Sequence, residues 1–177
     1  MRDALIVSTA RTPIAKSYRG TFNNTTAPTM AGWAIEQAVI RSGADPKDVD
    51  DVIMGAALQQ GTTHGNIARN SALAAGLPVT VSGMSIDRQC SSGMMAIGTA
   101  AKQIIIDGMD IVVGGGLDSI SLVQTDKMNL HKYVDKNLVS KHRHIYMPML
   151  QTAEVVAKRY NISREDQDQY SLQSQLR

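Results

Sequence analysis

The chain has 177 residues, which is long enough for one compact domain or for one domain and part of another. Its net charge of +2 is too small to predict binding to nucleic acid or to an anionic membrane surface, and no apolar run approaches the length of a membrane span. The one cysteine excludes an intrachain disulfide and fits a reducing compartment, so we expect a soluble cytoplasmic protein.

Strand-like and helix-like segments alternate from the start of the chain. An apolar run at residues 4–10 predicts a buried strand, and apolar spacing from Thr29 predicts a helix that Gly43 ends. The run at 91–107 is almost wholly apolar or small until Lys102, so we expect a central helix covered on most sides. Further strands are predicted at 51–57, around Met84 and Ile86, and at 110–114, with a helix at 64–75. This order is typical of a layered α/β domain with a largely parallel sheet, and it makes residues 4–116 one core.

The character of the sequence changes after Ser121. Residues 124–143 are rich in Lys and Arg, have few acids and show no clear period, which indicates a long loop or the start of an inserted segment. Helical spacing returns at 149–160. Ser163, followed by two acidic residues, is typical of an N-cap that starts a last helix.

Cys90 is the most informative residue because it lies where a strand-like run meets a helix-like one. A thiolate at a helix N-terminus is stabilised by the helix dipole and by free backbone N–H groups, which makes it a better nucleophile. Ser91, Ser92 and Gly93 would form a first turn small enough for a substrate carbonyl to approach. A small buried hydrophobe is the competing interpretation of a lone cysteine. The position favours a nucleophile, whose base must come from elsewhere in the fold.

Other motifs carry weaker signals. The glycines at 114–116 fit no phosphate-binding fingerprint, so we expect them to end a strand and to let backbone pass close to another element. We expect Asp118 and Ser119 to pair with nearby backbone, which favours a structural role over a catalytic one. The histidines at 131, 142 and 144 complete no familiar ligand spacing, so no metal is expected, and the basic stretch around them favours a solvated loop over a polyanion site. Methionines either fill the core or line a pocket for a flexible acyl chain, at Met94, Met95, Met147 and Met149.

Together these motifs resemble the N-terminal part of the thiolases, the family of acetyl-CoA acetyltransferases and 3-ketoacyl-CoA thiolases. The matching segments fall in order along essentially the whole chain, and the cysteine motif at 88–93 is their centre. The other matching segments are 10–13, 51–55, 114–121, 152–154 and 160–168.

The resemblance implies a layered thiolase-like α/β fold, with a mixed, mostly parallel sheet and helices on both faces, of which only the N-terminal half is present. It implies an N-terminal core domain at 1–121 and the truncated start of an inserted loop domain at 122–177. Cys90 would accept an acyl group as a thioester, with its backbone N–H in an oxyanion hole, and Met149 would bind the acyl substrate. Acetyl-CoA would attack the thioester in a Claisen condensation, and thiolysis of 3-ketoacyl-CoA is the reverse. The resemblance implies coenzyme A thioesters as substrates and no cofactor.

The chain departs from the family pattern at two points. Pro148 and Leu150 flank Met149 where many thiolases have histidine and glycine, which predicts a different acyl pocket from that of the short-chain biosynthetic enzymes. The Gly-His-Pro motif that activates the nucleophile and the second, acid/base cysteine both belong to a C-terminal half that these residues lack. We therefore expect a fragment that cannot complete a turnover alone and that exposes apolar surface where the missing half docks.

Three functions fit the sequence. The first is thiolase acyl transfer in fatty acid metabolism, with this chain supplying the nucleophile half to acyl-CoA and acetyl-CoA. The second is a catalytically inactive thiolase-like fragment that acts through assembly. The resemblance implies a dimer or dimer of dimers in either case, with the strand near residues 84–86 paired across the interface. The third is a condensing enzyme of fatty-acid or polyketide synthesis, which the Arg-Gln-Cys order at 88–90 disfavours.

Overall fold

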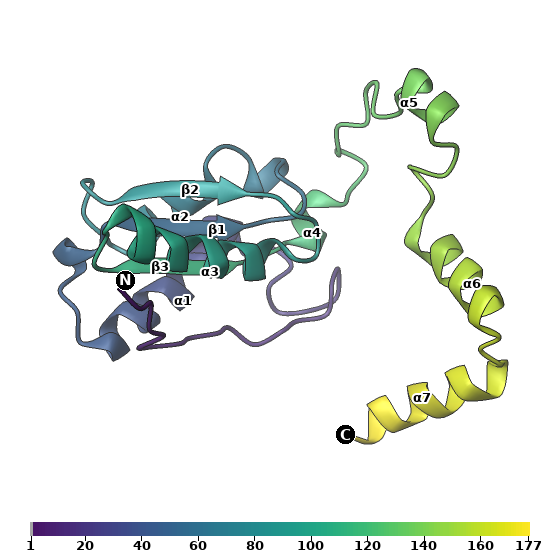
Figure 1. The fold of residues 1–177 in the computed structure, drawn as a ribbon, viewed down its shortest axis with the longest axis horizontal. Helices are drawn as coiled ribbons and strands as arrows, with labels where there is room; N and C mark the ends of the chain where they lie inside the picture. Colours follow the sequence, from purple (N-terminus) through teal and green to yellow (C-terminus); the bar gives the residue numbers. More distant parts are fainter. Residues whose placement is uncertain (1) are drawn as a thin grey trace. The chain divides into compact units, whose positions relative to one another are not determined.

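The computed structural model describes residues 2–177, and Figure 1 shows the elements along the chain. The chain divides into two compact units, Met1–Asn129 and Leu130–Arg177. Four α-helices in the described part of the first unit are α1 (Ala27–Ser42), α2 (Ile67–Ala74), α3 (Ser92–Lys102) and the short α4 (Ile120–Val123). Its strands are β1 (Asp51–Gly55), β2 (Ser82–Ile86) and β3 (Val112–Gly116). The second unit contains α5 (Lys136–Lys141), α6 (Met149–Tyr160) and α7 (Arg164–Leu176).

The strands within residues 2–177 form one parallel sheet in the order β2-β1-β3. Parallel strands need long crossovers, and here α2 links β1 to β2 while α3 links β2 to β3. The last residues of the strands, Gly55, Ile86 and Gly116, lie side by side in the register, so all three strands end at the same edge. The predicted α/β fold with a parallel sheet is confirmed.

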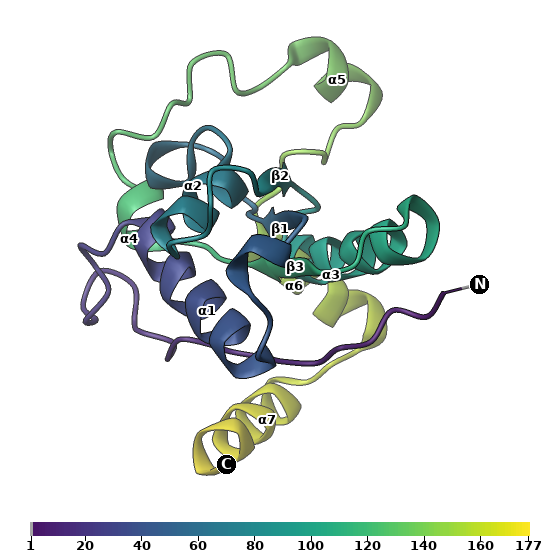
Figure 2. The same ribbon diagram turned by 90° about the vertical axis from the view of Figure 1, so that its left-hand side faces the viewer.

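Helices cover both faces of this sheet (Figure 2). On one face α1 and α2 pack in the larger core, where Ile35 and Ala72 join Val52 of β1. On the other face α3 contributes Ala96 to a smaller cluster with Ile53. Successive side chains of a strand point to opposite faces, which is why the neighbours Val52 and Ile53 belong to different clusters. β1 is therefore buried on both faces, as is typical of a central parallel strand.

Local sequence explains several helix ends. α1 has a proline in its first turn and ends at Gly43, whose φ of +74° is the left-handed C-cap conformation that glycine favours. α3 runs on into one π-type turn, η3 (Gln103–Asp107). α7 starts with a capping box, in which Ser163 and Asp166 each accept a hydrogen bond from the backbone N–H of the other. The predicted end of the first helix and the predicted cap of the last are both confirmed.

The N-terminal segment differs from the prediction. Residues 4–10 pair with no described strand, and the apolar side chains of Leu5, Ile6 and Val7 are 76–78% exposed. Extended backbone becomes a buried strand only where a neighbouring strand bonds to it, and no such neighbour lies within residues 2–177. The prediction of a buried strand at 4–10 is therefore wrong for this chain.

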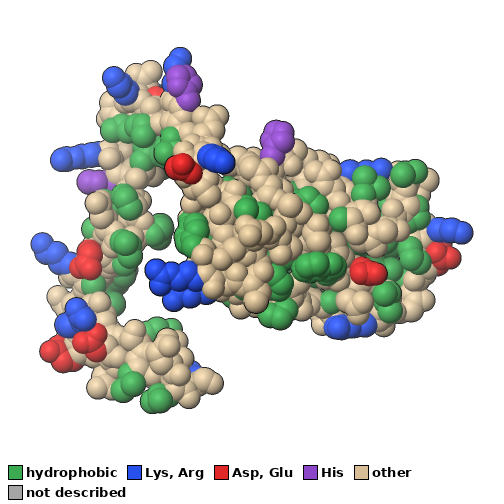
Figure 3. Space-filling view, turned by 180° about the vertical axis from the view of Figure 1, so that it is seen from behind, with side chains coloured by type: hydrophobic (Ala, Val, Ile, Leu, Met, Phe, Trp, Pro, Cys, Tyr) green, Lys and Arg blue, Asp and Glu red, His purple; other side chains and the backbone are tan. Residues whose placement is uncertain are grey.

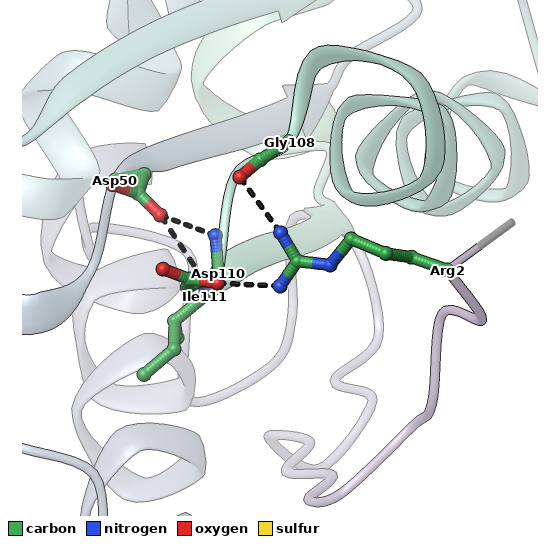
Figure 4. Close-up of polar contacts among 5 residues, drawn as sticks. All are labelled: Arg2, Asp50, Gly108, Asp110 and Ile111. Atoms are coloured by element: carbon green, nitrogen blue, oxygen red, sulfur yellow. Dashed lines mark hydrogen bonds and ion pairs between the residues drawn. The ribbon is translucent and has the colours of Figure 1, made fainter.

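Side-chain bonds hold the start of this segment near β3 (Figure 4). Arg2 donates to the carbonyl of Gly108 at 2.8 Å and forms an ion pair with Asp110, in the loop before β3. Asp50, just before β1, accepts hydrogen bonds from the backbone N–H groups of Asp110 and Ile111 at 2.8 and 3.1 Å. These bonds tie the N-terminal segment and the loop before β3 to the amino-terminal edge of the sheet.

α3 is less covered than predicted. Its sheet-facing side is buried through Ser92, Ala96 and Ala100. On its outer side, however, Met94 is 79% exposed and Ile97 is 46% exposed. The expectation of a helix covered on most sides is therefore wrong within the described residues, because the sheet is the one layer that covers it.

The second unit is helical and has no buried residue between 130 and 177, a range that the structure describes in full. Asp135 caps α5 by accepting from the N–H groups of Asn137 and Leu138. Lys, Arg and His side chains project from the surface around α5 (Figure 3). None of the described helices combines the length and the apolar character that crossing a bilayer requires.

Candidate active site

The carboxyl ends of the three strands bring three loops to one edge of the sheet. Ala56 and Ala57 follow β1, the cysteine motif follows β2, and Leu117 and Asp118 follow β3. Ligands of open parallel sheets bind at this edge, because the loops there converge and the next helix begins there. The arrangement makes this edge the candidate site of the first unit.

Cys90 lies in the turn between β2 and α3, as its position in the sequence predicted, and its side chain is exposed. The exposure contradicts the alternative in which this cysteine fills a core. Cys90 comes directly before Ser91, the N-cap of α3, whose side chain makes no capping hydrogen bond. The thiol is thus next to the positive end of a helix whose first turn has no cap from Ser91.

The turn around Cys90 is tight and contains an unusual backbone conformation. Gln89 has a φ of +49°, a left-handed value that side chains with a Cβ seldom adopt. The N–H of Ser91 donates to the carbonyl of Arg88 at 3.1 Å, and the N–H of Ser92 donates to the carbonyl of Gln89 at 3.0 Å. The Asp87 carboxylate accepts from the N–H of Gln89 at 2.7 Å. These bonds close the chain sharply from strand to helix, and Cys90 is exposed within this turn.

Two glycines let the first turn of α3 lie directly on the sheet. A Cβ on Gly55, the last residue of β1, would lie 2.2 Å from the carbonyl carbon of Ser92. A Cβ on Gly116, the last residue of β3, would lie 2.7 Å from the Cα of Gly93. Since Cβ contacts under 3.0 Å are essentially never seen, only glycine fits these positions. The prediction that glycines at 114–116 permit a close backbone approach is confirmed.

Asp118 joins the loops after β1 and β3. Its carboxylate accepts a hydrogen bond from the N–H of Ala57 at 3.1 Å, so Asp118 pairs with backbone as predicted, but with a loop 61 residues away in the sequence and not with its own turn. The side chain of Ser119 makes no capping hydrogen bond. Burial raises the pKa of Asp118 above its ordinary value; the backbone N–H groups of Ala57 and Leu58 oppose this effect, and the negative charge of Asp87 adds to it. The Asp87 carboxylate therefore lies close enough to Asp118 for its charge to affect the pKa of Asp118.

Sequence reasoning missed the roles of Asp87 and Ser92. The side chain of Ser92 is only 3% exposed and hydrogen-bonds to backbone on the strand side of Cys90. A signal was present, because Asp and Ser side chains commonly bond to backbone two or three residues away in turns. Nothing in the sequence marked which of the neighbouring polar residues would do so.

Met149, the other predicted site residue, belongs to the second unit. It begins α6 and lines an open pocket of about 360 Å³ with Thr152, Ala153 and Val156. Its predicted role in binding the acyl group stays a prediction.

Known proteins resemble this chain along nearly its whole length. The sequence matches the thiolase N-terminal domain family over residues 4–177. A 3-ketoacyl-CoA thiolase of Bacillus subtilis is 36% identical over 98% of the chain, and an acetyl-CoA acetyltransferase of Cupriavidus necator is 37% identical over 99%. The crystal structure of the Bacillus anthracis acetyl-CoA acetyltransferase matches 97% of the chain with a TM-score of 0.82 and 36% identity. The chain spans about half of these relatives, or 44%, 47% and 45% of their respective lengths.

Proposed function

The chain belongs to the thiolase family, and we propose that it supplies the nucleophile half of a thiolase, with Cys90 as the acceptor of the acyl group. The observation that carries this proposal is the exposed thiol at the start of α3, on the carboxyl edge of a parallel sheet. Thiolates at helix starts are good nucleophiles, and covalent catalysis divides one difficult acyl transfer into two easier steps.

The reaction begins with attack of the Cys90 thiolate on the carbonyl carbon of an acyl-CoA. A bond forms between Sγ and the acyl carbon, the bond from that carbon to the sulfur of CoA breaks, and CoA leaves as a thiolate that takes up a proton. The backbone N–H of Cys90 stabilises the negative charge on the carbonyl oxygen during this step. In condensation, the deprotonated α-carbon of acetyl-CoA then attacks the thioester and releases Cys90; thiolysis of a 3-ketoacyl-CoA runs these steps backwards.

We also propose that the partner of this chain is a C-terminal thiolase half, which brings the activating histidine and the acid/base cysteine. Three observations support such a partner: the chain spans about half of its relatives, residues 5–7 expose apolar side chains, and so does the outer side of α3 at Met94 and Ile97. Groups of exposed apolar side chains are typical of a surface that another chain covers. The same surface also favours the second candidate, a catalytically inactive fragment that acts through assembly alone.

Reconstitution tests the first function against the second. The chain is co-expressed with the C-terminal half of the Bacillus subtilis relative, and thiolysis of acetoacetyl-CoA is followed in the purified assembly. We expect activity with the native chain and with Ser91→Ala, whose side chain caps nothing, and none with Cys90→Ala. A folded, soluble assembly that is inactive with the native chain overturns the catalytic proposal and favours the assembly module.

Other properties of thiolases come to this chain as predictions. These are the use of acyl-CoA and acetyl-CoA as substrates, a place in fatty acid metabolism, a dimer or dimer of dimers, and a cytoplasmic location. Chemical labelling separates the two candidates further, because a nucleophilic Cys90 reacts with iodoacetamide at neutral pH faster than an ordinary exposed thiol does.

A further inference from the structure

The backbone of Gln89, the residue directly before Cys90, is held by side chains at both of its polar groups. Its N–H donates to the Asp87 carboxylate at 2.7 Å, and its carbonyl accepts from the hydroxyl of Ser92 at 2.6 Å, in addition to the 3.0 Å bond from the Ser92 N–H. The Ser92 hydroxyl oxygen also accepts from the N–H of Arg88 at 2.8 Å. Ser92 follows Cys90 while Arg88 and Gln89 precede it, so the bonds of one buried hydroxyl connect the chain on the two sides of the nucleophile.

These bonds hold a conformation that Gln89 would not otherwise favour. A φ of +49° is unfavourable for a residue with a Cβ, and such conformations persist only where the surrounding structure enforces them. The conformation also decides the direction in which the next residue leaves the turn. If the bonds to Gln89 are lost, its backbone relaxes and the thiol and N–H of Cys90 change direction.

Ser92 itself is held in place by the sheet. Its backbone lies against Gly55, so closely that a Cβ there would come within 2.3 Å of the Ser92 carbonyl oxygen. The first turn of α3 therefore has no room to move toward the sheet. This contact fixes the position from which the Ser92 hydroxyl bonds to the turn at Arg88 and Gln89.

We propose that Ser92 is a positioning residue for Cys90, with Asp87 as its partner: together they lock Gln89 in the left-handed conformation and so set the direction of the Cys90 thiol and N–H. This inference rests on the proposed acyl transfer by Cys90. It assigns Ser92 no contact with substrate, only control of the attacking geometry. Misplacement of a reacting group by about an ångström lowers rates by roughly a hundredfold, so a change in this turn has a large kinetic effect.

The test uses the assembly of this chain with a C-terminal half and compares Ser92→Ala with Ser91→Ala. Both substitutions remove one hydroxyl at the start of α3, but of the two hydroxyls only that of Ser92 bonds to the turn. For Ser92→Ala we expect kcat to fall by about tenfold or more while KM stays within about twofold, because the loss affects attack and not substrate binding. Ser91→Ala keeps the native kcat. In the chain alone, iodoacetamide labels Cys90 more slowly in Ser92→Ala than in Ser91→Ala.

A rescue experiment separates positioning from simple stabilisation. Glycine adopts positive φ without strain, so adding Gln89→Gly to Ser92→Ala restores part of the lost kcat if the lock acts through the conformation of Gln89. A kcat for Ser92→Ala equal to that of Ser91→Ala overturns the inference, and so does a double variant with no recovery. If Ser92→Ala does not fold, the exposed Asp87→Ala provides the same test, since it frees the other end of Gln89; an unchanged kcat there also overturns it. Full activity of Cys90→Ala overturns the proposed function instead, so the two failures are distinguishable.

Discussion

Gly55→Ala tests whether the turn that carries Cys90 rests directly on the sheet. The new Cβ would lie 2.2 Å from the Ser92 carbonyl carbon, 2.3 Å from its oxygen and 2.6 Å from the Gly93 nitrogen. All three are backbone atoms, so no flexible side chain can yield and the first turn of α3 has to move by about an ångström. Overpacking of this kind lowers the free energy of unfolding by about 1–3 kcal/mol, and the rigid neighbours place Gly55→Ala at about 3 kcal/mol.

Gly98→Ala, within α3, is the matched control. Apart from its chain neighbours and the backbone of its own helix, a Cβ at this exposed position meets no described atom within 4 Å, and removing a mid-helix glycine raises the free energy of unfolding by roughly 0.5–1 kcal/mol. The two glycine-to-alanine changes therefore have opposite signs. Urea unfolding followed by fluorescence of Trp33, the only tryptophan, reports on the first unit. A Gly55→Ala value within about 0.5 kcal/mol of the native chain, with the same m-value, would refute the packing of α3 on β1.

Three further predictions concern charge and surface. Because burial raises the pKa of Asp118, the folded chain binds the proton of this carboxyl group more tightly than the unfolded chain does. The protonated Asp118 therefore contributes stability that is fully present below about pH 4 and is lost as pH rises through the raised pKa. In Asp118→Asn, urea midpoints measured from about pH 4 to 7 fall less than in the native chain. Asp50→Ala removes the acceptor of the Asp110 and Ile111 N–H groups and lowers the free energy of unfolding by about 1–2 kcal/mol, and a change near zero contradicts that role. Met94→Lys, at an exposed position, changes the free energy of unfolding of this chain by less than about 0.5 kcal/mol but weakens its co-purification with a C-terminal half. If the C-terminal half recovers the native chain and Met94→Lys equally, this surface is excluded as the docking face.

The order of elements and the position of Cys90 could be predicted because they depend on local pattern. Continuous apolar runs at 51–57 and 91–107 identified a buried strand and a helix, and the change of pattern between 86 and 91 placed the cysteine at their junction. The family resemblance rested on motifs that are also local. None of these predictions depended on which helices and strands pack against one another.

The errors share one physical cause, which is burial that depends on a neighbour. Residues 4–10 and the outer side of α3 are as apolar as a core requires, yet no described element covers them. Apolar character predicts that a segment will be covered, not which segment will cover it. The lock on Gln89 escaped prediction for a different reason: a left-handed turn is normally marked by glycine or asparagine, and here side-chain bonds from Asp87 and Ser92 hold a glutamine in that conformation.

The central claim, that Cys90 accepts the acyl group, is tested most directly by finding the acyl group. The assembly with a C-terminal half is incubated with isotope-labelled acetyl-CoA, quenched in acid, digested and analysed by mass spectrometry. We predict one labelled acetyl group on the peptide that contains Cys90, released by added CoA before the quench and missing from Cys90→Ala. Label on another residue with Cys90 unmodified in an active assembly, or undiminished turnover by Cys90→Ala, would contradict the claim.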